Sequence, residues 1–257
     1  MIDVSARRFK GEHLQLRDFL WYTTEMASYV TAVYTRVRNT DETTYTIFKE
    51  RVVPIRYPLP RDFDKYPLPL KIITVLLMDT HALARHPLPS VFKISFCFLD
   101  YWKLPYETER DGLGDCEDTS IYMGAHLHAL ARISDTAVNY YVTLGLVKLP
   151  DGTMGGHAWV EYRDMDGDWV IYETTLEKAP WRSYREYKAW VTDVLLKEVQ
   201  YLPIIRFNHK EVRVLRRGEL HEVGYMMWSR KNLKYTLTKH TVVCKLRKHL
   251  QKLVPST

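Results

Sequence analysis

The sequence has few cysteines and few glycines, and its apolar runs are short. Only 3 of its 257 residues are cysteine, and no two form a CxxC pair, so neither a disulfide-stapled secreted domain nor a zinc ribbon is expected. The 11 glycines and 12 prolines are too few for a low-complexity chain. The longest largely apolar run, 72–78, is far shorter than the ~18 residues that a membrane-spanning helix needs.

What is present is an ordinary globular composition, with 46% hydrophobic and 26% charged residues. The length fits one large domain or two modest ones. Residues 1–8 include basic side chains with no apolar stretch behind them, so no signal peptide is visible and a cytoplasmic location is predicted. In a reducing compartment, a single well-placed cysteine with a distant histidine is a candidate nucleophile.

Charge is unevenly distributed along the chain. Residues 206–257 hold 13 Lys and Arg against 3 Asp and Glu, a net charge of +10, whereas residues 1–205 carry a net charge of −4. The basic segment favours nucleic acid or an anionic lipid surface as a partner, and the alternative is a solvated basic face.

Apolar periodicity and turn residues predict an α+β fold. Eight of the twelve prolines lie between residues 54 and 105, which predicts short elements joined by extended loops in that stretch. The predicted helices are 14–36, 70–85, 91–101, 116–132, 184–199 and a basic helix 242–253, and the predicted strands are 138–147, 157–162, 169–172 and further strands after residue 205.

Cys116 is the cysteine in the most informative context, the segment 112–119. Asp115 before it is a good N-cap, so Cys116 is expected in the first turn of a helix. The positive end of the helix dipole and the unpaired backbone N–H groups there favour the thiolate over the thiol. The alternative for Cys116 is a buried structural cysteine. Cys97 and Cys244 are expected to be packing residues.

His157 and Glu173 complete a candidate triad. His157 enters a predicted strand behind two glycines, where its ring can reach a helix terminus. If 157–162 and 169–173 form a hairpin, Glu173 lies near His157 and can orient its imidazole. The alternative for these two residues is a core histidine and an edge-strand glutamate.

These three segments resemble the transglutaminase-like superfamily, a circularly permuted branch of the papain-like cysteine peptidases. The family pattern of Gly-Asp-Cys, Gly-His-Ala-Trp-Val and Trp-x-x-x-Asp-x-Thr reads here as 114–116, 156–160 and 169–175, with Glu173 in place of the usual Asp. The segment 101–108 resembles the Tyr-Trp-x-x-Pro-x-Glu-Thr stretch of bacterial and archaeal transglutaminase-like cysteine proteinases. The resemblance covers residues 91–180 and implies a nucleophile helix packed on an antiparallel sheet, with extra N-terminal helices.

The resemblance implies a cysteine-dependent amide-bond hydrolase, a peptidase or isopeptidase. Cys116 would attack an acyl carbonyl to give a thioester, His157 would move the proton, and Glu173 would hold His157. Resolution by an amine, as in a transglutaminase, is the alternative, and protein, peptide and cell-wall isopeptide substrates are all admissible. The candidate oxyanion donors are the Cys116 backbone N–H with Trp102 or Tyr106, although both rings also fit an aromatic core.

Calcium is the only cofactor that the resemblance suggests, and none is required. Asp115, Glu117 and Asp118 offer hard oxygen ligands beside the nucleophile, as in the periplasmic members that this stretch resembles. The alternative is helix capping by first-turn acids. No GxGxxG or P-loop pattern indicates a nucleotide.

Three regions are predicted: a helical and proline-rich region 1–90, a catalytic core 91–205 and a basic C-terminal extension 206–257. A rival interpretation, from another class of protein, is a non-catalytic module that binds nucleic acid through the basic extension. Only the charge of that extension supports it, because it contains no recognisable nucleic-acid motif.

Overall fold

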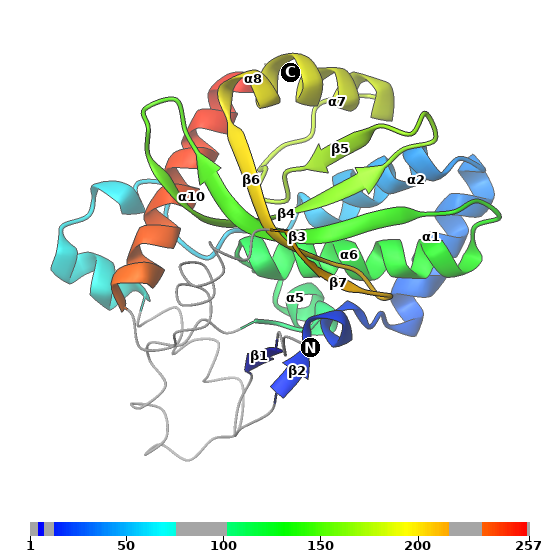
Figure 1. The fold of residues 1–257 in the computed structure, drawn as a ribbon, viewed down its shortest axis with the longest axis horizontal. Helices are drawn as coiled ribbons and strands as arrows, with labels where there is room; N and C mark the ends of the chain where they lie inside the picture. The colour runs from blue at the N-terminus through cyan, green and yellow to red at the C-terminus, as the bar shows by residue number, and fades with distance from the viewer. Residues whose placement is uncertain (1–4, 8–12, 76–101, 216–232, 256–257) are drawn as a thin grey trace.

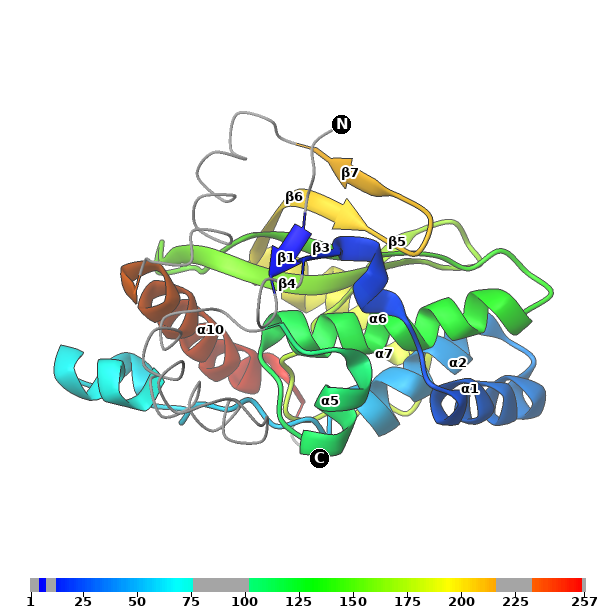
Figure 2. The same cartoon turned by 90° about the horizontal axis from the view of Figure 1, so that it is seen from below.

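The computed structural model describes residues 5–7, 13–75, 102–215 and 233–255 (Figure 1). Its centre is a five-stranded sheet with the strand order β5-β4-β3-β6-β7, in which all neighbouring strands run antiparallel. Figure 2 shows the helices gathered on one side of this sheet. The fold is therefore α+β, as the sequence predicts. The strands of the sheet are β3 (Asn139–Lys148), β4 (Met154–Arg163), β5 (Trp169–Tyr172), β6 (Gln200–Phe207) and β7 (Val212–Val214).

The other described elements lie before, between and after these strands along the chain. Residues 68–75 form a further helical segment. The named elements are β1 (Ser5–Arg7), β2 (His13–Gln15), η2 (Leu16–Leu20), α1 (Thr24–Val37), α2 (Thr40–Ile47), η3 (Phe48–Val52), η4 (Phe63–Lys65), α5 (Pro105–Asp111), α6 (Cys116–Ile133), α7 (Tyr184–Trp190), η6 (Val191–Leu195), α8 (Leu196–Glu198) and α10 (Leu233–Leu253).

Two tight turns build the β3-β4-β5 meander. The backbone N–H of Gly152 donates to Leu149 O at 2.9 Å, and that of Gly167 donates to Asp164 O at 3.0 Å. Both glycines have positive φ, 79° and 92°, a conformation that glycine adopts without the strain of a Cβ. The strands start and end within a few residues of the predicted bounds, because the turn residues are local signals.

Close backbone approaches fix two helices against the sheet. A Cβ on Gly124 of α6 would lie 2.6 Å from Val142 of β3, so the absence of a side chain lets helix and strand meet. A Cβ on Gly155 of β4 would likewise lie 2.7 Å from the side chain of Val242 on α10. The core between these layers is fully buried and apolar, and it includes Leu130, Leu144 and Val160 among many others.

The N-terminal part differs from the single predicted helix 14–36. It comprises β2, the 3-10 helix η2 and α1, and the break falls where Thr23 caps α1 by accepting a hydrogen bond from Met26 N at 3.2 Å. A cap at Thr23 ends the apolar periodicity that made the stretch look continuous. Helix α2 was not predicted, because its Thr-rich sequence has low helix propensity, and it begins at the N-cap Asn39.

Other predictions are partly outside the described residues. Of the predicted helix 70–85, residues 70–75 are described and helical, in a helix that begins at residue 68, while residues 76–85, the predicted helix 91–101 and Cys97 lie outside the described residues. The predicted helix 184–199 is present as α7, the π-helix η6 and α8. The basic helix predicted at 242–253 begins earlier, at Leu233.

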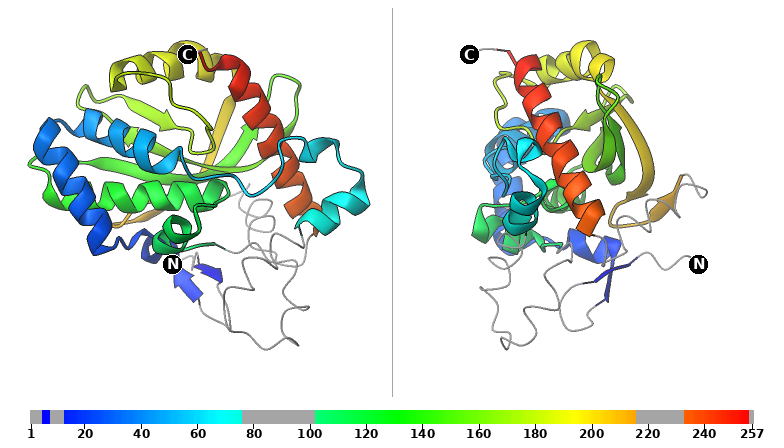
Figure 3. Two further views of the ribbon diagram at one scale, coloured as in Figure 1. Left: turned by 180° about the vertical axis from the view of Figure 1, so that it is seen from behind. Right: turned by 90° about the vertical axis from the view of Figure 1, so that its left-hand side faces the viewer.

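The basic C-terminal region contributes to the central sheet. Strand β6 pairs with β3 from Gln200 to Phe207, so the predicted boundary between residues 205 and 206 falls inside a strand. From behind, α10 runs beside the segment that holds η4 and the helical residues 68–75 (Figure 3). Within the described part of the chain, no helix is long and apolar enough to cross a bilayer.

Candidate active site

Cys116 is the first residue of α6, as the sequence predicts, and its side chain is completely buried. Asp115 is the N-cap: its Oδ1 accepts from the Asp118 backbone N–H at 3.4 Å, and Asp118 Oδ2 accepts from the Asp115 backbone N–H at 3.3 Å. This reciprocal pair satisfies two N–H groups that a helix start leaves open, and it fixes where α6 begins.

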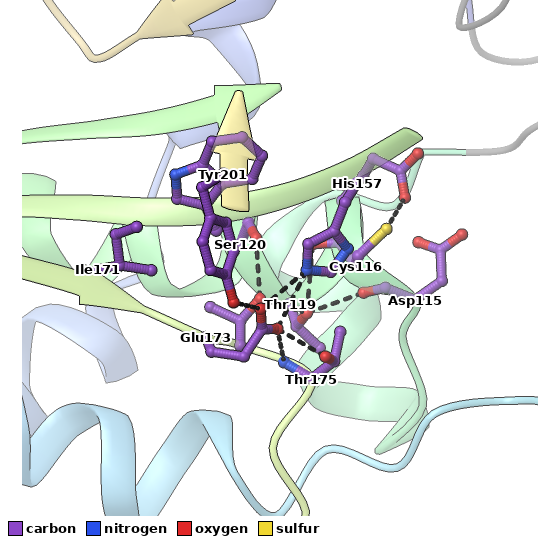
Figure 4. A network of polar contacts seen from close by, with 12 residues as sticks. Asp115, Cys116, Thr119, Ser120, His157, Ile171, Glu173, Thr175 and Tyr201 are labelled. Atoms are coloured by element: carbon purple, nitrogen blue, oxygen red, sulfur yellow. Dashed lines mark hydrogen bonds and ion pairs between the residues drawn. The ribbon is translucent and has the colours of Figure 1, made fainter. Parts of the chain in front are cut away.

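His157 and Glu173 meet through the predicted hairpin. Strands β4 and β5 pair with Val160 opposite Tyr172, which places Glu173 just beyond the end of β5 beside His157. His157 Nε2 lies 3.1 Å from Glu173 Oε1 and 3.0 Å from Oε2, and both side chains are buried. In the view of Figure 4 the imidazole is seen between the Glu173 carboxylate and the Cys116 side chain.

The Glu173 carboxylate accepts further hydrogen bonds that stabilise its charged form. Thr175 donates its hydroxyl to Oε1 at 2.6 Å and its backbone N–H to the same oxygen at 3.1 Å, and the Tyr201 hydroxyl donates to Oε2 at 2.7 Å. Burial by itself raises the pKa of Glu173, but His157 and these donors outweigh it, so that the pKa is lowered from its ordinary value. A carboxylate held in this way fixes the orientation of the His157 ring.

This geometry assigns the two nitrogens of His157 different roles. Because an ionised carboxylate only accepts, Nε2 carries a proton in the neutral ring and Nδ1 is left as a lone pair. Nδ1 is buried and has no hydrogen-bond partner. It is therefore the ring nitrogen that is open to receive a proton.

The Cys116 thiol is not hydrogen-bonded to His157 in this structure. Its Sγ donates instead to Glu117 Oε2 at 3.0 Å. Burial, followed by the negative charge of Glu117, raises the pKa of Cys116 well above its usual value, although Lys239 lowers it. The expectation of a thiolate-favouring helix start was thus wrong for this arrangement, because desolvation and a neighbouring carboxylate outweigh the helix dipole.

A lysine far along the chain contacts the acidic residues on both sides of Cys116. Lys239, on α10, places its Nζ 2.9 Å from Asp115 Oδ2 and 2.6 Å from Glu117 Oε1, and only 1% of its side chain is exposed. Burial by itself raises the pKa of Asp115, but the charge of Lys239 outweighs it and holds that pKa below its ordinary value. The sequence analysis did not identify Lys239, since its contact with α6 spans more than 120 residues.

Asp118 is used differently from the other two predicted calcium ligands. Besides its role in the cap, its Oδ1 accepts from the Lys103 backbone N–H at 2.8 Å. Burial and the nearby Asp115 charge raise the pKa of Asp118 well above its usual value. Among the described residues, the acidic cluster whose carboxylate oxygens lie close enough together to share a metal ion is a different one, made of Asp164, Asp166 and Asp168. The Lys188 ammonium forms ion pairs with all three of these carboxylates.

The two predicted oxyanion donors occupy different environments. Trp102 is buried at 2% exposure and packs edge-on against Phe19, with ring centroids 5.7 Å apart. Tyr106 lies on α5 and is 46% exposed. Neither side chain makes a hydrogen bond within the described parts of the chain, so the geometry of Trp102 fits the aromatic-core alternative.

Four of the basic residues of α10 are engaged in ion pairs. Besides Lys239, Lys245 pairs with Asp151, Arg247 with Glu177 and Lys248 with Asp64. These pairs attach α10 to the rest of the fold. These four side chains, together with Arg206 and Arg213, which pair with Glu161 and Glu211, contribute to the +10 charge and face acidic partners within the molecule.

A cavity of about 380 Å³ adjoins the candidate site. Gly114 and Thr119, from the nucleophile segment, line it together with Thr174 and Thr175, which follow Glu173. The Thr174 hydroxyl is also hydrogen-bonded to Thr119 Oγ1 at 3.0 Å, so the Cys116 and Glu173 segments are joined at the wall of this cavity.

Comparison with known proteins gives matches among solved structures alone. No family model and no curated protein matches the chain. The chain is similar to Legionella pneumophila LapG at 17% identity, covering 84% of this chain and 97% of that one with a TM-score of 0.32. It is also similar to calcium-bound LapG (17% identity, 73% and 87% coverage, TM-score 0.31) and to EGTA-treated LapG (16% identity, 84% and 97% coverage, TM-score 0.32).

These matches span most of both chains. A TM-score near 0.32 is too low to carry an argument about activity, so the function has to be argued from this chain's own residues.

Proposed function

We propose that the chain is a cysteine-dependent amide-bond hydrolase that acts on a peptide or protein through a thioester intermediate. The observation that carries this proposal is the hydrogen bonding of His157: Nε2 is held by both oxygens of Glu173, while Nδ1 is buried without a partner. A histidine fixed in this tautomer next to a helix that begins with cysteine has the parts of a nucleophile–base pair.

In the proposed reaction, the thiol first leaves Glu117 Oε2 and turns to His157 Nδ1. Nδ1 takes the thiol proton as Sγ bonds to the acyl carbon, and the oxyanion forms near the backbone N–H of Cys116. The C–N bond then breaks, and the leaving amine takes the proton from Nδ1. Water attacks the thioester with Nδ1 again accepting a proton, and that proton returns to the sulfur when the carboxylic acid is released.

The test uses iodoacetamide alkylation followed by mass spectrometry of the modified cysteines. We expect labelling at Cys116 that falls at least about tenfold in His157→Ala, because the base that accepts the thiol proton is lost. Cys244 is an internal control, since its thiol donates to the Pro60 backbone oxygen at 3.6 Å and its labelling should not respond to the loss of His157. Labelling confined to Cys97 or Cys244 would overturn the assignment of Cys116.

Hydrolysis and acyl transfer to an amine share every step up to the thioester. A fluorescent primary amine added with a peptide mixture distinguishes them: hydrolysis releases new termini with no amine incorporated, and transglutamination incorporates the amine. The expected outcome is hydrolysis, and both outcomes require Cys116.

A further inference from the structure

Lys239 is a buried cation between two acidic residues of the nucleophile segment. We infer that its ammonium is the built-in counter-cation of this site, so that the chemistry of Cys116 does not require a divalent metal ion. This inference concerns the regulation of the proposed active site and therefore rests on the proposed function. It starts from two contacts, 2.9 Å to Asp115 Oδ2 and 2.6 Å to Glu117 Oε1.

The predicted calcium ligands do not fit a calcium ion in this arrangement. Calcium needs 6–8 oxygen ligands at about 2.3–2.6 Å. One oxygen each of Asp115 and Glu117 already faces the lysine ammonium, and Asp118 uses its oxygens on backbone N–H groups of the cap and of Lys103. A divalent ion bound by these carboxylates would lie within a few ångströms of a buried positive charge.

The burial of Lys239 shows that its ammonium depends on the neighbouring carboxylates. A lysine at 1% exposure is costly to hold in a protein interior unless it is paired and hydrogen-bonded. Glu117 links it to the nucleophile, because one carboxylate oxygen accepts from Lys239 and the other accepts from the Cys116 thiol. The ammonium, the carboxylate and the thiol thus form one continuous chain of contacts.

The helix that carries Lys239 is fixed in place by contacts outside the site. Lys245 pairs with Asp151 in the β3-β4 turn, and Lys248 pairs with Asp64. Val242, one turn after Lys239, packs on Gly155 of β4. The position of the Lys239 ammonium is therefore fixed by the packing of α10 against the rest of the fold.

The first test measures the native chain. The rate of Cys116 alkylation is compared in excess CaCl₂ and in EGTA, and calcium binding is measured by isothermal titration calorimetry. We expect the two rates to agree within about twofold and no calcium to bind at this site. A rate at least about tenfold lower in EGTA, or calcium binding that Glu117→Gln abolishes, would overturn the inference.

The second test removes the internal cation with Lys239→Met, which keeps the length of the side chain. We expect alkylation of Cys116 to fall at least about tenfold and to be restored by millimolar CaCl₂, with calcium binding gained at the vacated acids. Lys239→Arg should retain the native rate, and Lys252→Met, at an exposed position on the same helix, is the matched control that should leave the rate unchanged. The inference is wrong if Lys239→Met alkylates at the native rate.

Circular dichroism shows whether Lys239→Met is folded, and if it is not, the measurements on the native chain decide the question by themselves. The binding measurements also separate the two proposals. If Cys116 proves unreactive, the proposed function fails, whereas the inference about Lys239 is still judged by calcium binding to the native chain.

Discussion

Glu173 and Glu117 are two buried glutamates on either side of the candidate catalytic pair, and their carboxylates are stabilised in different ways. Glu173 accepts from an imidazole, two hydroxyls and a backbone N–H, none of which carries a fixed charge. Glu117 accepts from a permanent ammonium and from the thiol. The first carboxylate is arranged for a positive charge that arises only when His157 is protonated, whereas the second has its positive charge built in.

This contrast shows how one site can hold two buried carboxylates near a thiol that must ionise. On the imidazole side, a negative charge assists the reaction because it stabilises the imidazolium. On the thiol side, a negative charge opposes it, and the lysine limits that opposition. Replacing each glutamate by glutamine should therefore have opposite consequences.

The largest expected effect is that of Glu173→Gln. Its amide can donate to Nε2 and so favour the wrong tautomer of His157, which removes the lone pair from Nδ1. We expect a loss of about 10³–10⁴-fold in turnover with the fold retained, by analogy with carboxylate-to-amide changes in other triads. Peptide hydrolysis and the thermal midpoint are the measurements, and near-native turnover would break the proposed role of Glu173.

Glu117→Gln should act in the opposite direction. It removes a negative charge from the thiol's neighbour while Lys239 stays paired with Asp115, so the pKa of Cys116 should fall. We expect alkylation at pH 7 to rise by about tenfold for each unit by which the pKa falls. Slower alkylation in this variant would mean that Glu117 assists thiol ionisation, and the proposed contrast with Glu173 would be lost.

A third prediction concerns acid stability, because the buried histidines outside the site have lowered pKa values. Burial lowers the pKa of His126 to about 4. A folded-state pKa below the unfolded value of about 6.5 means that the contribution to stability is fully present above pH 6.5 and is lost as the pH falls to 4. The free energy of unfolding should thus decrease by about 1.4 kcal/mol per pH unit in this window for this histidine.

His126→Leu should flatten this dependence. His126 Nε2 is buried without a partner, and Nδ1 lies 2.9 Å from the Tyr122 backbone oxygen, so an apolar side chain of similar size gives up one hydrogen bond, worth about 0.5–1.5 kcal/mol. Urea unfolding at pH 7 and at pH 5 measures the change, and an equal loss of stability in both proteins would refute the assignment of the titrating group.

The smallest expected effect is that of Tyr201→Phe. It removes one of several hydrogen bonds to Glu173, worth about 1–2 kcal/mol for a bond to a charged group, so turnover should fall about tenfold or less. Thr175 and His157 still hold the carboxylate. A loss as large as that of Glu173→Gln would show that Tyr201 is needed for more than orientation.

Local signals account for what the sequence predicted correctly. Asp115 before Cys116 marks the start of α6, and the turns 149–152 and 164–167 mark the ends of β3, β4 and β5, so the relative placement of His157 and Glu173 followed from the hairpin. The thiol's environment was harder to predict, because burial is a property of the whole fold.

Long-range partners were beyond the reach of the pattern. Nothing adjacent to Tyr201 or Lys239 in the sequence indicates that either side chain contacts the site. The acids around Cys116 do imply that a cation is needed, but the sequence offers many lysines and arginines, and only the path of α10 selects Lys239. The break at Thr23 in the predicted helix 14–36 shows the same limit at shorter range, since a cap competes with a continuous apolar period.

Gly155 has a consequence that reaches beyond its own strand. It lies in the Gly-Gly-His sequence, where a glycine is expected to give the backbone before the histidine conformational freedom. Its lack of a side chain instead sets the spacing between β4 and α10, since a Cβ there would come within 2.7 Å of Val242. One added methyl group would push the helix outward at a position one turn from Lys239, so a substitution on the histidine strand would loosen the electrostatic balance around the cysteine.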